Sequence, residues 1–298
     1  MSEPRKSATD HHPLFPARRS PNHSRADHVY DRRAPHRPID SAINDYLGLA
    51  LLSDAKINLR VARLFNLPVA DSFTVLVLSL ARSDTRPTTS SELQCRRIRD
   101  FLAIRFSHPI PVVLTSGWGT VLIPATALTT GRLGDFVSGL TAAVDVPVTS
   151  VAVESAVQGI PDAASIAREL LDVAIRLRKA PRLYRLADLA LEHQLTRPGP
   201  GRDKLVSLLA PLDASPDLRR TLFALVNHQF DRRNVARRLH VHPNTIGNRL
   251  AQILELTGLP PTSDSQWRLY AAVVASRFVG GVGLPVDSTP GAVVFQSE

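Results

Sequence analysis

At 298 residues the chain is long enough for one large or two small cores, and 44% of its residues are apolar. Its single cysteine excludes an intramolecular disulfide framework, and no apolar run approaches the ~20 residues that would cross a bilayer. The net charge of +9 is uneven, because residues 217–278 hold nine arginines against four carboxylates while residues 39–216 are nearly balanced. We therefore expect a cytoplasmic protein that binds no membrane and has a basic C-terminal region.

The two ends of the chain have the composition of disordered segments. Residues 1–38 are rich in Pro, Arg, Ser and His, and residues 280–298 are rich in Gly and Pro. Residues 39–66 carry apolar side chains at helical spacing, and Pro68 ends that pattern. We thus expect a disordered basic arm, a helical segment that is a candidate for dimerisation, and a disordered tail.

Strand and helix patterns alternate between residues 67 and 180. The predicted strands are Phe73–Leu80, Pro111–Thr115, Gly119–Ile123 and Val148–Val153. The predicted helices are Glu92–Phe106, Leu133–Val144 and a third that begins near Asp162. This order is typical of an α+β domain of the ferredoxin-like type, with its helices on one face of the sheet. Residues 181–214, which contain the Pro- and Gly-rich run RPGPGR, are expected to be a connecting segment.

Residues 215–279 are predicted to form an all-helical domain. Its first helix can begin at Ser215-Pro216, and Ser263 with Gln266 predicts a capping box for its last helix. Between them we expect a short helix over about 232–239 and a longer one over about 243–257. Only three residues join these two helices, and this is the geometry of a helix-turn-helix.

The polar residues of the two central helices are suited to nucleic acid. At ~100° per residue, Thr245, Asn248, Arg249 and Gln252 lie on one side of the longer helix, where they can donate to and accept from base edges in a major groove. The shorter helix carries four arginines that can contact phosphates. Pattern alone leaves a second interpretation open, in which both are solvated faces of a helical bundle.

Three short motifs extend this argument to a family. They are Leu239–Ile246 (LHVHPNTI), the pair Arg249-Leu250, and Glu255–Leu259 (ELTGL). Together they closely resemble the C-terminal helix-turn-helix of PucR/CdaR-type transcriptional regulators. The preceding strand-helix order resembles the degenerate GGDEF-like domain of the same family, so that the resemblance covers about residues 67–278.

The resemblance implies a sequence-specific DNA-binding transcriptional regulator and not an enzyme. Pattern and resemblance together assign DNA contact to Arg232, Arg233, Arg237, Arg238, His242, Asn244, Thr245, Asn248, Arg249 and Gln252. The expected partners are double-stranded DNA and a second copy of the chain, with RNA polymerase as a candidate and an effector that the sequence does not identify. No metal and no cofactor are expected.

Several residues favour other interpretations. Gly247 and Asn248 stand where many family members carry larger or charged side chains, and we expect no counterpart of the family's long sensor domain. The alternative function is therefore a protein-interaction or small-ligand signalling module whose helix-turn-helix no longer binds DNA specifically. We do not expect cyclase chemistry, because the hairpin at residues 116–120 has no carboxylate to hold a metal. For His240 and His242 we expect turn and cap roles instead of metal binding.

Overall fold

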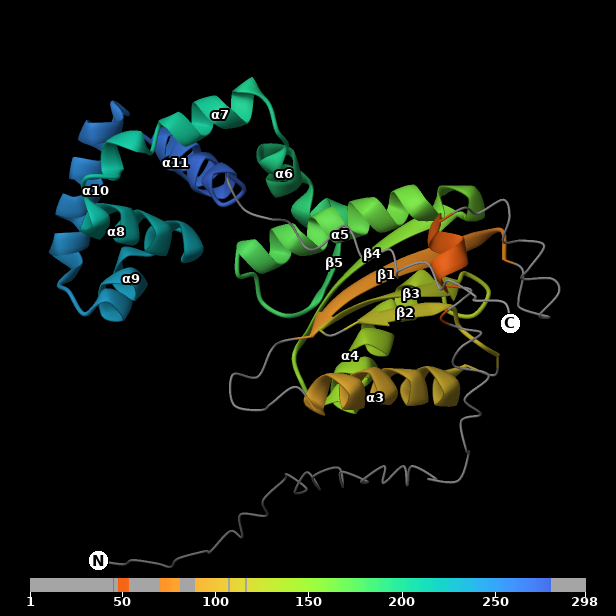
Figure 1. The fold of residues 1–298 in the computed structure, drawn as a ribbon. Coiled ribbons are helices and arrows are strands. Elements are labelled where there is room, and N and C mark those ends of the chain that lie inside the picture. Colours follow the sequence, from red (N-terminus) through yellow and green to blue (C-terminus); the bar gives the residue numbers. More distant parts are fainter. Residues whose placement is uncertain are drawn as a thin grey trace, which may run out of the picture. The chain divides into compact units, whose positions relative to one another are not determined.

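The computed structural model describes residues 45, 48–53, 70–80, 89–106, 108–115 and 117–279. The expected basic arm, the expected tail and most of the expected helical segment 39–66 lie outside the described residues. The described part contains a sheet with its helices, followed by a group of further helices (Figure 1). Among the helices that the structure describes, none combines the length and the apolar character needed to span a lipid bilayer.

The described residues form a five-stranded sheet in the order β2-β3-β1-β4-β5 (Figure 1). Strand β1 (Ser72–Leu80) runs antiparallel to β3 (Trp118–Pro124) and to β4 (Val148–Ala156), and β2 (Val112–Thr115) runs antiparallel to β3. The short strand β5 (Leu183–Arg185) is parallel to β4. The first four strands thus have the arrangement of a ferredoxin-like domain, and the predicted α+β class is confirmed. Its GGDEF-like character stays a prediction.

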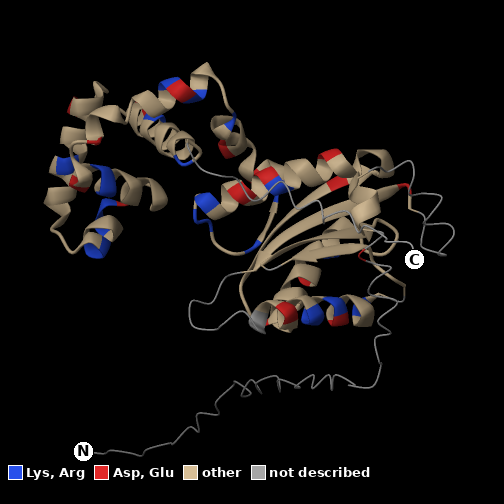
Figure 2. Ribbon diagram, in the orientation of Figure 1, with Lys and Arg blue, Asp and Glu red and all other residues tan. Residues whose placement is uncertain are grey.

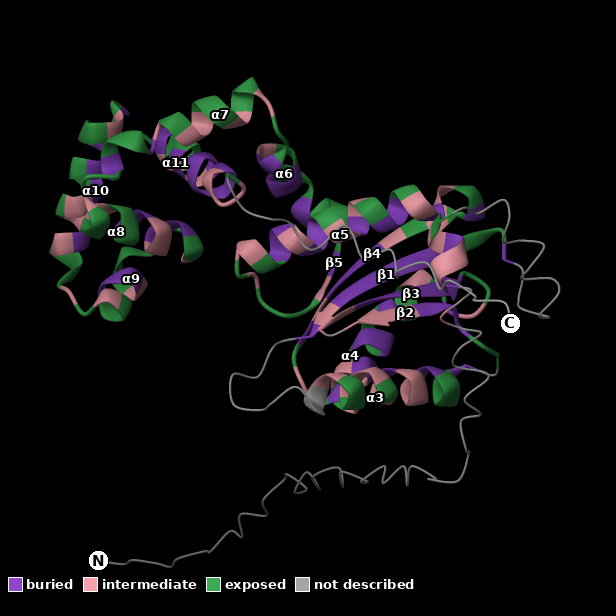
Figure 3. Cartoon of the chain, in the orientation of Figure 1, coloured by how far each residue is buried: buried purple, intermediate pink, exposed green. Residues whose placement is uncertain are grey.

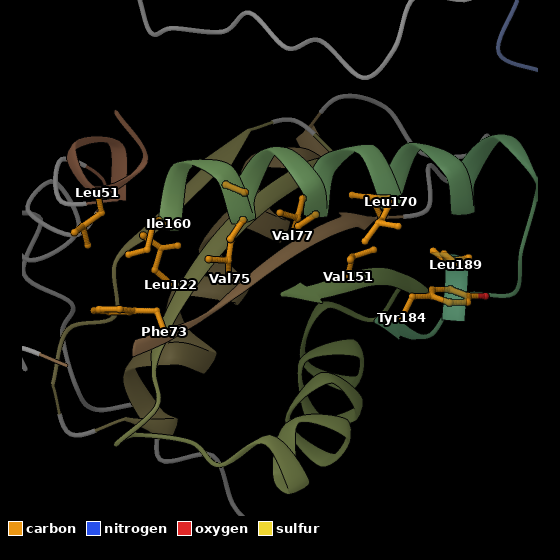
Figure 4. Close-up of a cluster of buried hydrophobic side chains, with 14 of the residues drawn as sticks. Leu51, Phe73, Val75, Val77, Leu122, Val151, Ile160, Leu170, Tyr184 and Leu189 are labelled. Carbon is orange, nitrogen blue, oxygen red and sulfur yellow. The ribbon is translucent and has the colours of Figure 1, made fainter. Parts of the chain in front are cut away.

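Strand β1 separates two hydrophobic cores, one on each face of the sheet. Val75 faces a core that it shares with α5 (Ile160–Arg176), which Figure 4 shows. Leu76 faces a second core, shared with α3 (Thr89–Arg105) and α4 (Leu133–Val144). The expectation of helices on one face only is therefore wrong, because α5 covers the other face. A strand buried on both faces needs apolar side chains at successive positions, which explains the unbroken run in β1.

Residues 48–53 are helical and pack against the sheet domain. Leu51 is 3% exposed and belongs to the core beneath α5 (Figure 4). Asp45 forms an ion pair of 2.7 Å with Arg99 of α3. A Cβ atom on Gly48 would lie 2.9 Å from the main-chain carbonyl of Val112, so this helix approaches β2 too closely for a side chain there. The described part of the candidate dimerisation segment thus takes part in packing within the chain.

Residues 181–214, expected to be a connecting segment, are largely folded. After β5 come α6 (Leu186–Thr196) and α7 (Pro200–Ser207). Proline is accommodated in the first turn of a helix, and so the Pro-rich run starts α7 instead of extending a loop. Leu189 of α6 is buried in the core of the sheet domain, whereas Leu212 is buried in the C-terminal core. The change from one core to the other therefore falls between these two residues.

Four further helices surround most of the C-terminal core. They are α8 (Pro216–Asn227), α9 (Arg232–Leu239), α10 (Pro243–Thr257) and α11 (Ser263–Ser276). Buried and exposed residues alternate along them as expected for helices that pack on one side (Figure 3). The predicted capping box of the last helix is not formed, because Thr262 is the N-cap and its hydroxyl lies 3.3 Å from that of Ser265.

One carboxylate on α6 is hydrogen-bonded both to a residue of the sheet domain and to a residue of the C-terminal helices. Glu192 accepts a hydrogen bond of 2.7 Å from Lys179 Nζ, just beyond α5, and one of 2.8 Å from the hydroxyl of Tyr270 on α11. Burial alone would raise the carboxyl pKa, but the bonds from Lys179 and Tyr270 outweigh it, and the pKa of Glu192 is lowered. Burial and the same carboxylate raise the pKa of Tyr270.

Candidate nucleic-acid interface

The turn between α9 and α10 consists of three residues, as the sequence predicts. His240 adopts a left-handed conformation with φ of 55°, and the next amide, Val241 N–H, donates to Ala236 O at 3.0 Å. His242 is the N-cap of α10, where its Nδ1 accepts from the Asn244 N–H at 3.2 Å. Because Nδ1 accepts, the ring proton is on Nε2, which leaves an outward donor at the entry to α10. The expected turn and cap roles of the two histidines are confirmed.

The two helices pack closely because small and apolar residues meet between them. Val235 and Ala236 of α9 are at most 1% exposed, and Ile246 and Ile253 of α10 are fully buried. The N-terminus of α9 is fixed by Asp231, whose Oδ1 accepts from the amides of the second and third helical residues at 3.0 and 3.1 Å. This cap was not predicted, although an aspartate directly before a run of helix-forming residues is its usual sign.

Most of the predicted DNA-contact residues are exposed. The exposed ones are Arg232, Arg233, Arg237, Arg238, His242, Asn244, Asn248 and Gln252. Thr245 and Arg249 are only partly exposed. The structure therefore presents eight of the ten predicted side chains to solvent on α9, the turn and α10.

The outer face of α10 carries side-chain amides. Asn244, Asn248 and Gln252 follow one another at intervals of four residues, so they lie in a row along the helix. Ala251, which sequence reasoning did not single out, is exposed beside this row. Nothing lies within 4 Å of the position that a Cβ atom on Gly247 would occupy. Amides that donate and accept on a surface with few bulky groups can approach base edges closely.

Arg249 is held by α8 and does not project freely. Its Nη1 donates to the hydroxyl of Thr221 at 3.1 Å, and its Nη2 lies 3.7 Å from Asp217 Oδ2. The side chain is 24% exposed, and Thr221 is fully buried. The sequence pattern of α10 alone does not show that Arg249 is the polar residue that faces α8. Its contact with DNA stays a prediction.

The arginines of α9 carry uncompensated positive charge. Figure 2 shows basic residues on this helix. Within residues 117–279, no hydrogen bond or ion pair engages the guanidinium groups of Arg232, Arg233, Arg237 or Arg238. By contrast Arg268, on α11, pairs with Asp264 at 2.9 Å. The charge available to a polyanion is therefore concentrated on the helix next to α10.

Neither the turn nor α9 offers a metal site. Among the described residues no group of three or more His, Cys, Asp or Glu side chains could hold a metal ion. The arrangement supplies a row of amides beside a cationic helix. Such a surface can bind a nucleic acid by contacts to its phosphates and base edges.

Comparison with known proteins identifies this helical region. Residues 218–275 match the model of the PucR C-terminal helix-turn-helix domain. The match runs from α8 into α11, and so includes the turn, the α9 arginines and the whole of α10. The predicted resemblance is confirmed for this region, which is a helix-turn-helix domain of the PucR type and supports a role in transcription regulation.

The chain is also similar to a solved structure over most of its length. That structure is the regulator of polyketide synthase expression from Bifidobacterium adolescentis, with 20% sequence identity, coverage of 81% of this chain and 95% of that chain, and a TM-score of 0.38. A search of curated proteins gave no match.

Proposed function

We propose that this chain is a transcriptional regulator that binds duplex DNA sequence-specifically, with α10 in the major groove. The observation that carries the proposal is the amide row on α10 beside the unpaired arginines of α9, inside a region of the PucR helix-turn-helix type. Its site of action is then the cytoplasm, where the DNA of a bacterial-type cell lies. No enzymatic activity is part of this proposal.

The amide row supplies base reading. Asn and Gln side chains form paired hydrogen bonds with adenine in the major groove, and each good pair discriminates against the wrong base by about 1–3 kcal/mol. Asn244, Asn248 and Gln252 are exposed in the right succession for this role. Thr245 and the Nε2 donor of His242 lie at the same end of α10 and can add contacts to a base or phosphate.

The arginines of α9 supply affinity that does not depend on sequence. Each neutralised phosphate releases counterions, so that the logarithm of the binding constant falls by about 0.9 per phosphate for each unit of log salt. Four unpaired guanidinium groups on one helix make such contacts without first breaking ion pairs within the protein. They would set the position of α10 on the duplex.

Arg249 would act by positioning α10 and not by reading bases. Its bond to the buried Thr221 connects α10 to α8. Removal of the Arg249 side chain would leave the buried Thr221 hydroxyl oxygen without this donor. The contact role assigned to Arg249 from the sequence thus becomes a supporting one in this proposal.

A homodimer would match DNA sites with two-fold symmetry. Helix-turn-helix dimers read two half-sites about 34 Å apart, or a multiple of that distance. RNA polymerase and an effector ligand are further partners consistent with a regulator. Sedimentation of the full chain with a bound operator tests the dimer, and a strict monomer on a single half-site would exclude it.

The deciding experiment is selection of genomic DNA fragments by the purified full chain at ~50 and ~200 mM salt. Recovery of a short motif at the higher salt, and its loss with the double variant Asn244→Ala/Asn248→Ala, is the expected result. The variant Arg96→Ala, on the exposed face of α3, is the matched control and should select the same motif. Selection without any motif would favour the alternative function, an interaction or signalling module.

A further inference from the structure

Three arginines line an open pocket to which α9 and α10 contribute none of the described lining residues. The pocket has a volume of about 460 Å³ and is lined by Arg176, Arg178, Phe223, Asn227 and Arg277. These five lining residues come from the end of α5 and the residues after it, from α8, and from the end of α11. The lining thus contains three cations and no carboxylate.

Two of these arginines are held in place by each other's helix ends. Arg277 Nη1 donates to Arg176 O at 2.7 Å, and Arg176 Nη1 donates to Arg277 O at 3.2 Å. Arg277 Nη2 also donates to Asn227 Oδ1 at 2.9 Å, and Arg176 Nε to Asp172 at 2.9 Å. These bonds satisfy the carbonyl ends of α5 and α11, whose partial negative charge the two guanidinium groups offset.

The third arginine has no such structural role among the described contacts. Arg178 is exposed, and no hydrogen bond or ion pair of its side chain occurs within residues 117–279. Its backbone is left-handed, with φ of 52°, at a helix end where glycine is usually found. An arginine costs stability in this conformation relative to glycine.

The charge of Arg178 acts on its neighbour. Burial, and then repulsion by Arg178, lower the pKa of Arg277, which means that the pocket disfavours the cationic form. Arg277 keeps unused N–H groups on both Nη atoms after the bonds described above. The face of Phe223 is also near, with its ring centroid 5.3 Å from the Arg277 guanidinium carbon. An oxyanion between Arg178 and Arg277 would relieve the repulsion and use these donors.

We propose that this pocket binds a phosphate-type oxyanion between Arg178 and Arg277, with the Asn227 amide at its edge. Guanidinium groups match the geometry of phosphate oxygens with paired hydrogen bonds. The oxyanion is either a free small phosphate ligand or a phosphate of the DNA backbone. Free-phosphate binding would stand whether or not α10 reads bases, because none of the pocket residues lies on α9 or α10.

Thermal unfolding of the full chain with inorganic phosphate as the probe tests the proposal. At a phosphate concentration about ten times the dissociation constant, the melting temperature of the wild type should rise by about 3–6 °C relative to chloride at equal ionic strength. Arg178→Gly removes the cation and relieves the left-handed backbone, so it should melt higher than wild type without phosphate and gain nothing when phosphate is added. Asp145→Gly relieves another left-handed residue, with φ of 57°, and should keep the full phosphate response.

A second arm distinguishes the two sources of the oxyanion. A duplex of defined sequence is titrated with wild type and with Arg178→Gly over a range of salt. If the phosphate belongs to DNA, the salt slope of Arg178→Gly falls by about one and free phosphate does not change the melting temperature. If the ligand is free, the slope is unchanged and the melting response to phosphate is lost. An equal rise of the melting temperature with phosphate in wild type and Arg178→Gly would overturn the proposal. So would the absence of any phosphate response together with an unchanged salt slope.

Discussion

Helices α9 and α10 are neighbours in one helix-turn-helix, yet their outer faces carry different chemistry. The face of α9 holds four guanidinium groups that have no partner among the described residues. The face of α10 holds neutral amides, and its one arginine is bonded to α8. Charge attracts any duplex, but only directional donors and acceptors distinguish one base pair from another. Under the proposed function, affinity and selectivity would therefore be assigned to separate helices, and each could be removed without the other.

The largest expected effect is loss of the α9 charge. Replacing Arg232, Arg233, Arg237 and Arg238 together with Gln should weaken DNA binding by about 10²–10³-fold at ~0.15 M salt, equally for every sequence. The salt slope should fall by about four. Fluorescence anisotropy on an operator and on random DNA measures both quantities. A loss confined to the operator would break the comparison, because α9 would then read sequence.

A smaller effect is expected on α10. Asn248→Ala should weaken operator binding by about 1–3 kcal/mol, which is about 5–150-fold, and leave random DNA and the salt slope unchanged. Competition between operator and random duplexes directly reports the ratio of the two binding constants. Asn234→Ala, a partly exposed asparagine on α9, is the matched control and should not change the ratio. Equal weakening on both duplexes would argue against a base-reading role for Asn248.

Arg249→Ala should act on stability before it acts on DNA. Loss of its bond to the buried Thr221 should lower the free energy of unfolding by about 1–2 kcal/mol, while the exposed Asp217 contributes little. Chemical denaturation followed by circular dichroism gives this value. Unchanged stability together with weaker DNA binding would instead return Arg249 to the direct-contact role expected from the sequence.

The smallest effect concerns the open side of α10. Gly247→Ala should raise the free energy of unfolding by about 0.5–1 kcal/mol, since alanine favours the helix and nothing lies within 4 Å of the added carbon. The same variant measured on operator DNA sharpens the comparison. If binding weakens although stability rises, we would infer that the α10 backbone at Gly247 lies close to the bases in the complex.

Local patterns allowed much of this domain to be predicted from the sequence. The bounds of α10 follow from Pro243 and Gly258, which act through nearest neighbours in the chain. The Asp231 cap of α9 is just as local, although it was not predicted. The hydrogen bond between Arg249 and Thr221 could not be predicted, because Thr221 lies 28 residues away on another helix. The side of α10 that faces α8 is set by tertiary packing, and periodicity does not report it.

The sheet domain shows the same limit. Alternation of strands and helices predicted its order, but strand β5 has three residues and no periodicity to detect. The position of α5 on the opposite face follows only from the two-sided burial of β1. The continuous apolar run of β1 indicates that both of its faces are buried. Interpreting the run as a central strand would have predicted helices on both faces of the sheet.

The shared carboxylate of Glu192 has a consequence for how the chain unfolds. If either core melted alone, one of the two donors, Lys179 or Tyr270, would be withdrawn from a carboxylate that is only 9% exposed. The remaining folded part would then contain an under-solvated negative charge. The lower pKa of Glu192 adds stability above its unfolded-state pKa, and that stability is lost as pH falls through the folded-state value. Near neutral pH the two cores should therefore melt as one cooperative unit, and acid should separate the transition into two.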